Sequence, residues 1–109
     1  MRIISQDGKI DVPYEMTAIH LLEGSVLMNM VGDTGKGSVI ATYSTSKKAQ
    51  KAMEMLREQY AHMKRVECMS ASLASCEVST LSNKDAKLLG DEVQKLMCFQ
   101  FPQDEDVEV

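Results

Sequence analysis

The sequence is poor in the residue patterns that mark metal and catalytic centres. Its three cysteines, Cys68, Cys76 and Cys98, form no C-x-x-C pair, and neither histidine lies near them in sequence. We therefore expect no metal site, and reduced, buried thiols instead. Neither a G-x-S-x-G elbow nor an H-E-x-x-H motif occurs, so no sequence motif indicates an activated nucleophile or a zinc-bound water. These absences predict a protein that is not an enzyme and that needs no cofactor.

Long apolar runs are missing too. No stretch approaches the roughly 18 consecutive apolar residues that indicate a membrane-spanning helix. The opening residues, Met1 to Ile4, lead directly into the polar Ser5 to Gly8, which is not typical of a secretory signal. We expect a cytoplasmic protein that does not contact a membrane.

The chain also lacks an excess of basic residues. It has 12 Lys and Arg against 16 Asp and Glu, a formal net charge of −4. Four of the acids are Asp104, Glu105, Asp106 and Glu108, so the rest of the chain is neutral. Without a basic patch, direct nucleic-acid binding is disfavoured. We divide the chain into one domain, 1–102, and an acidic tail, 103–109, which we expect to be solvated; a tail that mimics a polyanion is the alternative.

One helical pattern dominates what the sequence does contain. Apolar residues recur at steps of three and four and predict an amphipathic helix over about 45–65. Its apolar stripe consists of Ala49, Met53, Leu56, Tyr60 and Met63. Either Thr45 or Ser46 can cap the N-terminus with a hydroxyl group. Because an isolated helix of this length is only marginally stable in water, the stripe must pack against another layer.

Strand patterns fill the first 43 residues. Asp7-Gly8 favours a tight hairpin between strands over 1–5 and 10–12. A turn at Glu23-Gly24 separates two alternating runs, 17–22 and 25–31, whose two faces are both fairly apolar. A further strand is expected over 38–43.

The C-terminal half completes the predicted fold. Residues 66–82 indicate irregular strands or a long loop, and a shorter helix is expected over about 83–97. A final strand covers 98–101 and returns beside the first one. The predicted fold class is α+β, with an antiparallel sheet of about four to six strands and the long helix across one face.

A glycine-rich loop over 32–38 invites comparison with a phosphate-binding P-loop. The P-loop pattern would need glycine at position 30 and serine or threonine at position 37, where Met30 and Gly37 stand. A strand pattern follows the loop, whereas a P-loop is followed by a helix. We therefore predict a hairpin tip, with a backbone-amide cradle for an anion beside Lys36 as the alternative.

A few residues are candidates for binding. Arg57 lies one position from the apolar stripe, where its guanidinium could reach a carboxylate or a phosphate; an i,i+3 ion pair with Glu54 is the alternative. Phe99 and Phe101 share one face of the last strand, where they complete the core or offer a stacking surface. Nine methionines and the two-sided apolar strands favour a homo-oligomer, specifically a homodimer.

Three stretches of the sequence carry a resemblance. The opening MRIISQDGKIDVPYE, the middle YSTSKKAQKAMEMLRE and the ending FQFPQDEDVEV resemble a group of small uncharacterised proteins from phages, prophages and other mobile elements of Gram-positive bacteria. This resemblance implies an accessory protein that acts by binding in the bacterial host cell. It would antagonise antiviral defence, either by blocking a defence protein complex, as anti-CRISPR proteins do, or by sequestering a nucleotide-derived immune signal.

A weaker similarity concerns proteins that neutralise Thoeris-type defence, which are small and bind a cyclic nucleotide-derived signal; none of their motifs matches here. Such a signal needs cations and stacking groups, and the candidates in this chain are Arg57, Lys36, Arg65, Phe99 and Phe101. The second hypothesis is a structural or assembly factor of the mobile element. An enzyme is the third.

Overall fold

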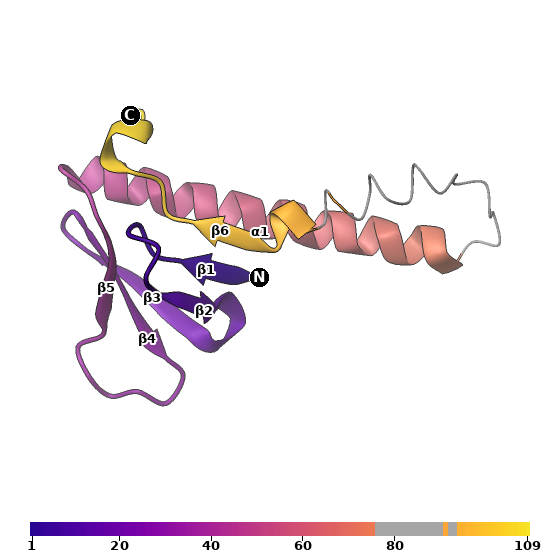
Figure 1. The fold of residues 1–109 in the computed structure, drawn as a ribbon, viewed down its shortest axis with the longest axis horizontal. Helices are drawn as coiled ribbons and strands as arrows, with labels where there is room; N and C mark the ends of the chain where they lie inside the picture. Colours follow the sequence, from indigo (N-terminus) through magenta and orange to yellow (C-terminus); the bar gives the residue numbers. More distant parts are fainter. Residues whose placement is uncertain (76–90, 92–93) are drawn as a thin grey trace.

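Six strands in two three-stranded sheets and one long helix form the described part of the chain (Figure 1). The computed structural model describes residues 1–75, 91 and 94–109. The terminal sheet, as we call it, has the order β2-β1-β6 and comprises β2 (Asp11–Pro13), β1 (Arg2–Ile4) and β6 (Cys98–Gln100). The hairpin sheet has the order β3-β4-β5 and comprises β3 (Thr17–Leu22), β4 (Ser25–Met30) and β5 (Ser38–Thr42). The helix is α1 (Ser46–Ser75). The predicted α+β class is confirmed.

The terminal sheet joins the two ends of the described chain. β1 pairs antiparallel with β2 through the predicted turn, in which Gly8 adopts φ 76°, a backbone conformation that glycine tolerates best. On its other side β1 pairs in parallel with β6, with Ile3 opposite Phe99. The sequence predicted antiparallel pairing throughout. A parallel pair requires a long crossover connection, and α1 lies within that connection.

The hairpin sheet contains an irregularity that the sequence pattern did not predict. β3 and β4 pair in regular register from Thr17↔Met30 to Leu22↔Ser25. Between β4 and β5 the register shifts, because Ile40 is an extra residue between the pairs Val26↔Ala41 and Leu27↔Val39. A bulge interrupts the alternation of faces. Ile40 and Ala41 are therefore both buried, whereas Val39 is 53% exposed.

Gln6 connects the two sheets. Its backbone N–H donates to the Ile40 carbonyl oxygen at 2.8 Å, and its Oε1 accepts from the Thr42 N–H at 3.0 Å. Its Nε2 donates to the Pro102 carbonyl oxygen at 3.1 Å. One side chain therefore ties the first hairpin turn to the edge of β5 and to the segment after β6.

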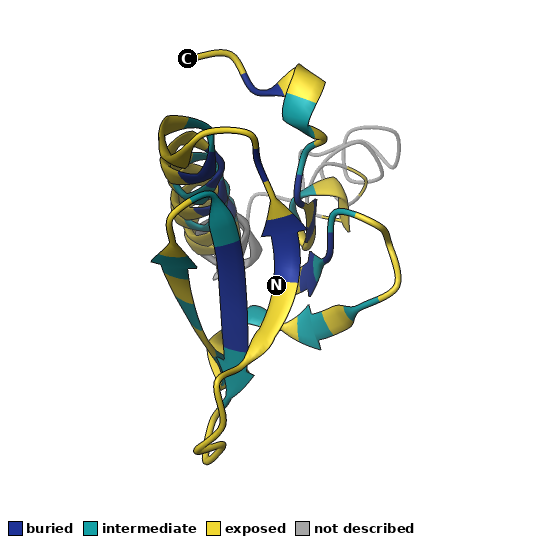
Figure 2. Ribbon diagram, turned by 90° about the vertical axis from the view of Figure 1, so that its left-hand side faces the viewer, coloured by how far each residue is buried: buried dark blue, intermediate teal, exposed yellow. Residues whose placement is uncertain are grey.

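Helix α1 begins where the sequence predicts and ends later. The Lys48 N–H donates to Thr45 Oγ1 at 3.2 Å, so Thr45 is the N-cap. The predicted stripe faces the protein interior, with Leu56 and Met63 almost fully buried. Figure 2 shows the helix along the β3–β4 side of the hairpin sheet. The helix continues to Ser75, so the prediction of strand or loop for residues 66–75 is wrong.

The predicted shorter helix, about 83–97, falls mostly outside the described residues. Within that range the structure describes Asp91 and residues 94–97, of which Asp91 and residues 94–96 are helical.

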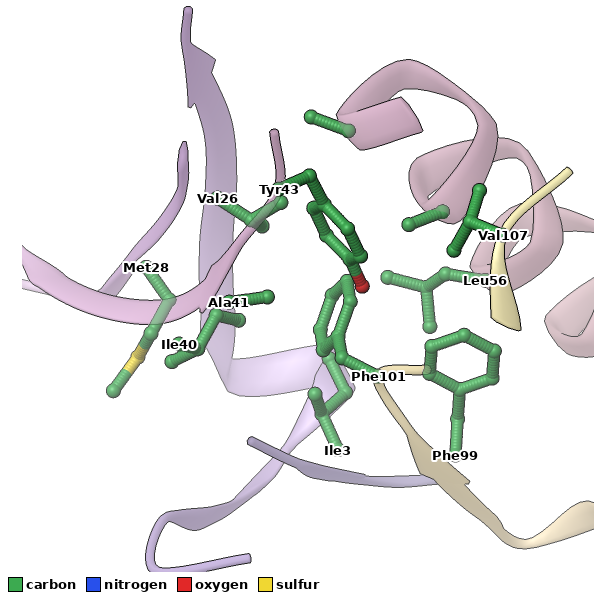
Figure 3. Close-up of a cluster of buried hydrophobic side chains, with 12 residues drawn as sticks. Ile3, Val26, Met28, Ile40, Ala41, Tyr43, Leu56, Phe99, Phe101 and Val107 are labelled. Atoms are coloured by element: carbon green, nitrogen blue, oxygen red, sulfur yellow. The ribbon is translucent and has the colours of Figure 1, made fainter. Parts of the chain in front are cut away.

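The core lies between the helix and the two sheets. Figure 3 shows four side chains converging: Tyr43 just after β5, Leu56 from α1, Phe99 from β6 and Phe101 just after β6. The rings of Phe99 and Phe101 meet edge to face, with centroids 5.3 Å apart, an arrangement that aromatic pairs favour. Tyr43 donates its hydroxyl hydrogen to the Pro102 carbonyl oxygen at 2.8 Å. Aromatic packing therefore fixes β6 and the residues after it against the helix.

The acidic segment over 103–109 packs on the fold, contrary to the expected solvated tail. Val107 is only 3% exposed and belongs to the core cluster. Asp104 Oδ1 accepts the Ser44 N–H at 2.7 Å, and the Lys48 ammonium donates to the Asp104 carbonyl oxygen at 2.9 Å. The hydrogen bond from Ser44, with Lys48 nearby, lowers the pKa of Asp104 below its usual value. A short 3₁₀ turn, η2 (Asp104–Asp106), positions Val107 for burial.

Candidate functional site

A pocket of about 350 Å³ opens between α1 and the hairpin sheet. Thr17 and Ile19 line it from the face of β3 that turns toward the helix, while Met53, Leu56 and Arg57 line it from α1. Tyr14 and Glu15, in the 3₁₀ turn η1 (Tyr14–Met16), complete the lining. The wall is therefore apolar at its base and carries one cation and one anion.

The turn η1 places an aromatic pair beside the pocket. Pro13 ends β2 with φ −73°, a value that its ring imposes, and Thr17 Oγ1 donates to the Tyr14 carbonyl oxygen at 2.9 Å. The Tyr14 ring then lies against the Tyr60 ring of α1, with centroids 4.6 Å apart and planes inclined by 40°. Lys64 Nζ lies 5.5 Å from the Tyr60 ring centroid, within the range of a cation–π contact.

Arg57 is the cation of the pocket wall. Its Nε donates only a long hydrogen bond, 3.4 Å, to the Met53 carbonyl oxygen. Among the described residues no carboxylate lies within ion-pair distance of its guanidinium. Glu54, the alternative partner considered from sequence, instead faces Lys51 at 3.9 Å. The guanidinium is exposed and has donors to spare for a ligand.

Glu15 is the anion of the pocket wall. Its carboxylate accepts two hydrogen bonds from the Met1 amino group, at 3.0 and 3.3 Å. This hydrogen bonding lowers the pKa of Glu15, and the charge of Lys64 contributes in the same direction. Because Glu15 is already paired, it neutralises little of the positive charge that Arg57 presents.

The five candidate ligand-binding residues do not form one site. Arg57 lines the pocket, but Arg65 is two turns further along α1, about 12 Å along the axis. Lys36 lies in the exposed loop at the end of the β4–β5 hairpin, away from α1 (Figure 1). Phe99 and Phe101 are buried in the core, so neither ring has a free face on which a ligand could stack.

The aromatic groups beside Arg57 were missed by the sequence reasoning. Tyr60 is part of the apolar stripe. The one feature of the sequence that could have marked it as a site residue is that a tyrosine usually keeps its hydroxyl group near water. Tyr14 follows Pro13 directly, which marks a strand end but gives no sign of a helix partner.

The described cysteines also differ from expectation. Cys68 and Cys98 are free but exposed, rather than buried. Cys76 lies outside the described residues. Among the residues that the structure describes, no group of three His, Cys, Asp or Glu side chains is placed to hold a metal ion.

None of the described helices is both long enough and apolar enough to cross a membrane. Comparison with protein-family models, with curated proteins and with solved structures found no match for this chain.

Proposed function

We propose that this protein is a non-enzymatic binding protein that captures a small phosphorylated ligand in the pocket at Arg57. In the setting of a mobile element, the ligand would be a nucleotide-derived signal of host antiviral defence, which the protein removes by sequestration. The observation that carries the proposal is the position of Arg57, an exposed guanidinium without a carboxylate partner among the described residues, on the wall of a pocket of about 350 Å³.

The pocket has the size and chemistry for such a ligand. Small-molecule sites usually measure about 300–1,000 Å³, so this one suits a single nucleotide unit better than a larger molecule. A guanidinium can donate two parallel hydrogen bonds to a phosphate. The Tyr14–Tyr60 pair offers aromatic surface for a base, and the Glu15 carboxylate can accept from a ribose hydroxyl.

Calorimetric titration tests the proposal directly. Cyclic mononucleotides, cyclic dinucleotides and ADP-ribose derivatives are titrated into the wild type, Arg57→Ala and Arg65→Ala. Hydrogen bonds to a charged group contribute about 1.5–3 kcal/mol, so Arg57→Ala should weaken binding about 10- to 100-fold. Arg65→Ala, an exposed arginine of the same helix outside the pocket, should bind like the wild type. Absence of binding by the wild type to every probe would remove the small-ligand function.

A protein target is the second form of the same function. One observation favours it, because Leu22 and Val39 are 64% and 53% exposed on the hairpin sheet, and exposed apolar side chains on one surface often mark a contact site. Co-purification from infected cells distinguishes the candidates. Capture of a host defence complex supports a blocking inhibitor, whereas capture of the element's own proteins supports a structural or assembly factor.

A further inference from the structure

Three of the four sheet edges carry a protecting feature. β2 ends in Pro13, which lacks the N–H that a further strand would need. The edge of β5 is occupied by Gln6, through the hydrogen bonds to Ile40 and Thr42. At β6, Gln59 of α1 donates its side-chain N–H groups to the Cys98 and Leu96 carbonyl oxygens at 2.7 and 3.3 Å. Such devices prevent unintended strand pairing.

The edge of β3 has none of these devices in the described part of the chain. Thr17–Leu22 contains no proline and no Asp, Glu, Lys or Arg, and among the described strands only β4 pairs with it. Figure 2 shows β3 as the outer strand, alternating between half-buried and exposed residues. In the described part of the chain, most of this six-residue edge is therefore available to another strand.

The register of the hairpin identifies which groups are free. Met16 accepts the Val31 N–H at 2.9 Å, and the pairing continues through Ala18↔Asn29 to Leu22↔Ser25. In an antiparallel ladder, every second residue directs both its N–H and its C=O at the neighbouring strand. Even-numbered residues of β3 therefore bond to β4, whereas Ile19 and Leu21 direct both backbone groups outward. Thr17 has only its C=O free, because its N–H donates to the Tyr14 carbonyl oxygen.

We infer that β3 pairs antiparallel with β3 of a second copy, around a two-fold axis at Ile19. This register places Ile19 opposite Ile19 of the partner subunit and Thr17 opposite Leu21 of the partner subunit. It uses the free backbone groups of Thr17, Ile19 and Leu21 in each copy, for about four backbone hydrogen bonds, because each Thr17 N–H is already bonded to Tyr14. The two hairpin sheets become one continuous sheet.

The same register favours a second copy over an unrelated strand. Met16 and Leu22, at the two ends of the strand, are 50% and 64% exposed. Pairing around Ile19 places Met16 opposite Leu22 of the partner subunit, so each end of the edge covers the apolar side chain of the other. A register shifted to His20 leaves Met16 beyond the paired residues, so its exposed apolar side chain stays uncovered.

The pairing also extends the pocket. Thr17 and Ile19 line it and lie at the shared edge, so Leu21 of the partner subunit continues the apolar floor. Two pockets then adjoin across the axis. The inference does not depend on the proposed ligand, because the strands pair without one.

The expected association is weak. Stable interfaces bury about 800 Å² on each partner, and six residues of edge with two apolar ends supply less than that. Half-association is therefore expected at roughly 10–100 µM.

Sedimentation velocity at protein concentrations from about 1 to about 500 µM tests whether the edge of β3 is the dimer interface. The wild type should shift from monomer to dimer, and Leu22→Lys should remain monomeric because it places a charge against Met16. Val39→Lys replaces a similarly exposed residue of β5 and should dimerise like the wild type. Both positions are exposed, so both variants should keep the wild-type thermal transition. A monomeric wild type, a dimeric Leu22→Lys variant or a monomeric Val39→Lys variant would each overturn the inference.

Cross-linking tests the register. In a variant whose native cysteines are replaced by serine, Ile19→Cys places two thiols opposite each other at the axis, where Cα atoms about 5.5 Å apart allow a disulfide. Mild oxidation should give a covalent dimer. His20→Cys should remain monomeric under the same conditions. The opposite result would show that the strands pair around His20, and cross-linking of neither would show that the edge is not the interface.

Discussion

Val107 offers the sharpest test of how the C-terminal segment contributes to stability. It follows three consecutive acids, yet it is 3% exposed and packs in the core. Val107→Ala removes two buried methyl groups, each of which contributes about 0.8 kcal/mol to the free energy of unfolding. A residual cavity adds about 24 cal/mol per Å³. The free energy of unfolding should therefore fall by about 2 kcal/mol, a substantial part of the roughly 5–15 kcal/mol that stabilises a typical domain.

Urea unfolding followed by circular dichroism measures this change. Val109→Ala is the matched control, because it makes the same chemical change two residues further on, at a side chain that is 76% exposed. Its effect should stay below about 0.5 kcal/mol. If Val107→Ala were no more destabilising than Val109→Ala, residues 103–107 would be solvated and the packing argued for them would be refuted.

Three other substitutions test local features. Thr45→Ala should lower stability by about 1 kcal/mol through loss of the helix N-cap, and Thr45→Ser should restore it, both measured in urea. Burial raises the pKa of Tyr43 to about 12. The folded protein therefore keeps a proton that the unfolded chain loses near pH 10, so stability should fall as pH rises from about 10 to about 12, and Tyr43→Phe should lessen that fall. Gly37 has φ 88°, and a Cβ there would collide with the Asn29 side chain, whereas a Cβ at Gly35 meets no atom within 4 Å. Gly37→Ala should therefore lower the free energy of unfolding by at least about 1 kcal/mol, and Gly35→Ala should lower it much less.

Local patterns in the sequence predicted the elements well. The alternating run 17–22 and the turn at Glu23-Gly24 gave the bounds of β3 as the structure has them. Thr45 was one of two residues predicted as the helix cap, and its hydroxyl makes the capping hydrogen bond. These features depend on residues a few positions apart, which is the range over which periodicity and capping carry information.

Long-range arrangement was not predictable in the same way. A single antiparallel sheet was expected, but the strands form two sheets: β1 pairs in parallel with β6, and Gln6, rather than another strand, bonds to the edge of β5. Nothing near Gln6 in sequence indicates that its side chain reaches both Thr42 and Pro102. The bulge at Ile40 likewise follows from how β5 meets β4 and has no sequence signal here.

The length of the helix could not be predicted from its apolar stripe. An apolar stripe reports which residues are buried, not which residues are helical. Beyond Arg65 the helix continues with Met69 63% exposed, so the stripe ends before the helix does. Alanine and other good helix formers in this stretch suffice to continue a helix that is already nucleated.

Of the residues around the candidate pocket, the sequence identified one. Arg57 stood out because it borders the stripe, and the structure places it on the pocket wall. Tyr14 and Tyr60 are far apart in sequence and meet because η1 turns the chain toward α1. Phe99 and Phe101 illustrate the reverse error, since a pair of aromatic residues on one strand face suits a core as well as a stacking surface.

The parallel pairing of β1 with β6 affects how the protein folds as it is synthesised. The β1–β2 hairpin and the hairpin sheet leave the ribosome early, but Phe99, Phe101 and Val107 belong to the core they share. These residues emerge only after the whole of α1, so the nascent chain exposes apolar surface until β6 and the segment up to Val107 have been synthesised. We expect the core to close only once residues up to Val107 have left the ribosome, with a need for chaperones that grows when translation of the intervening chain is slow.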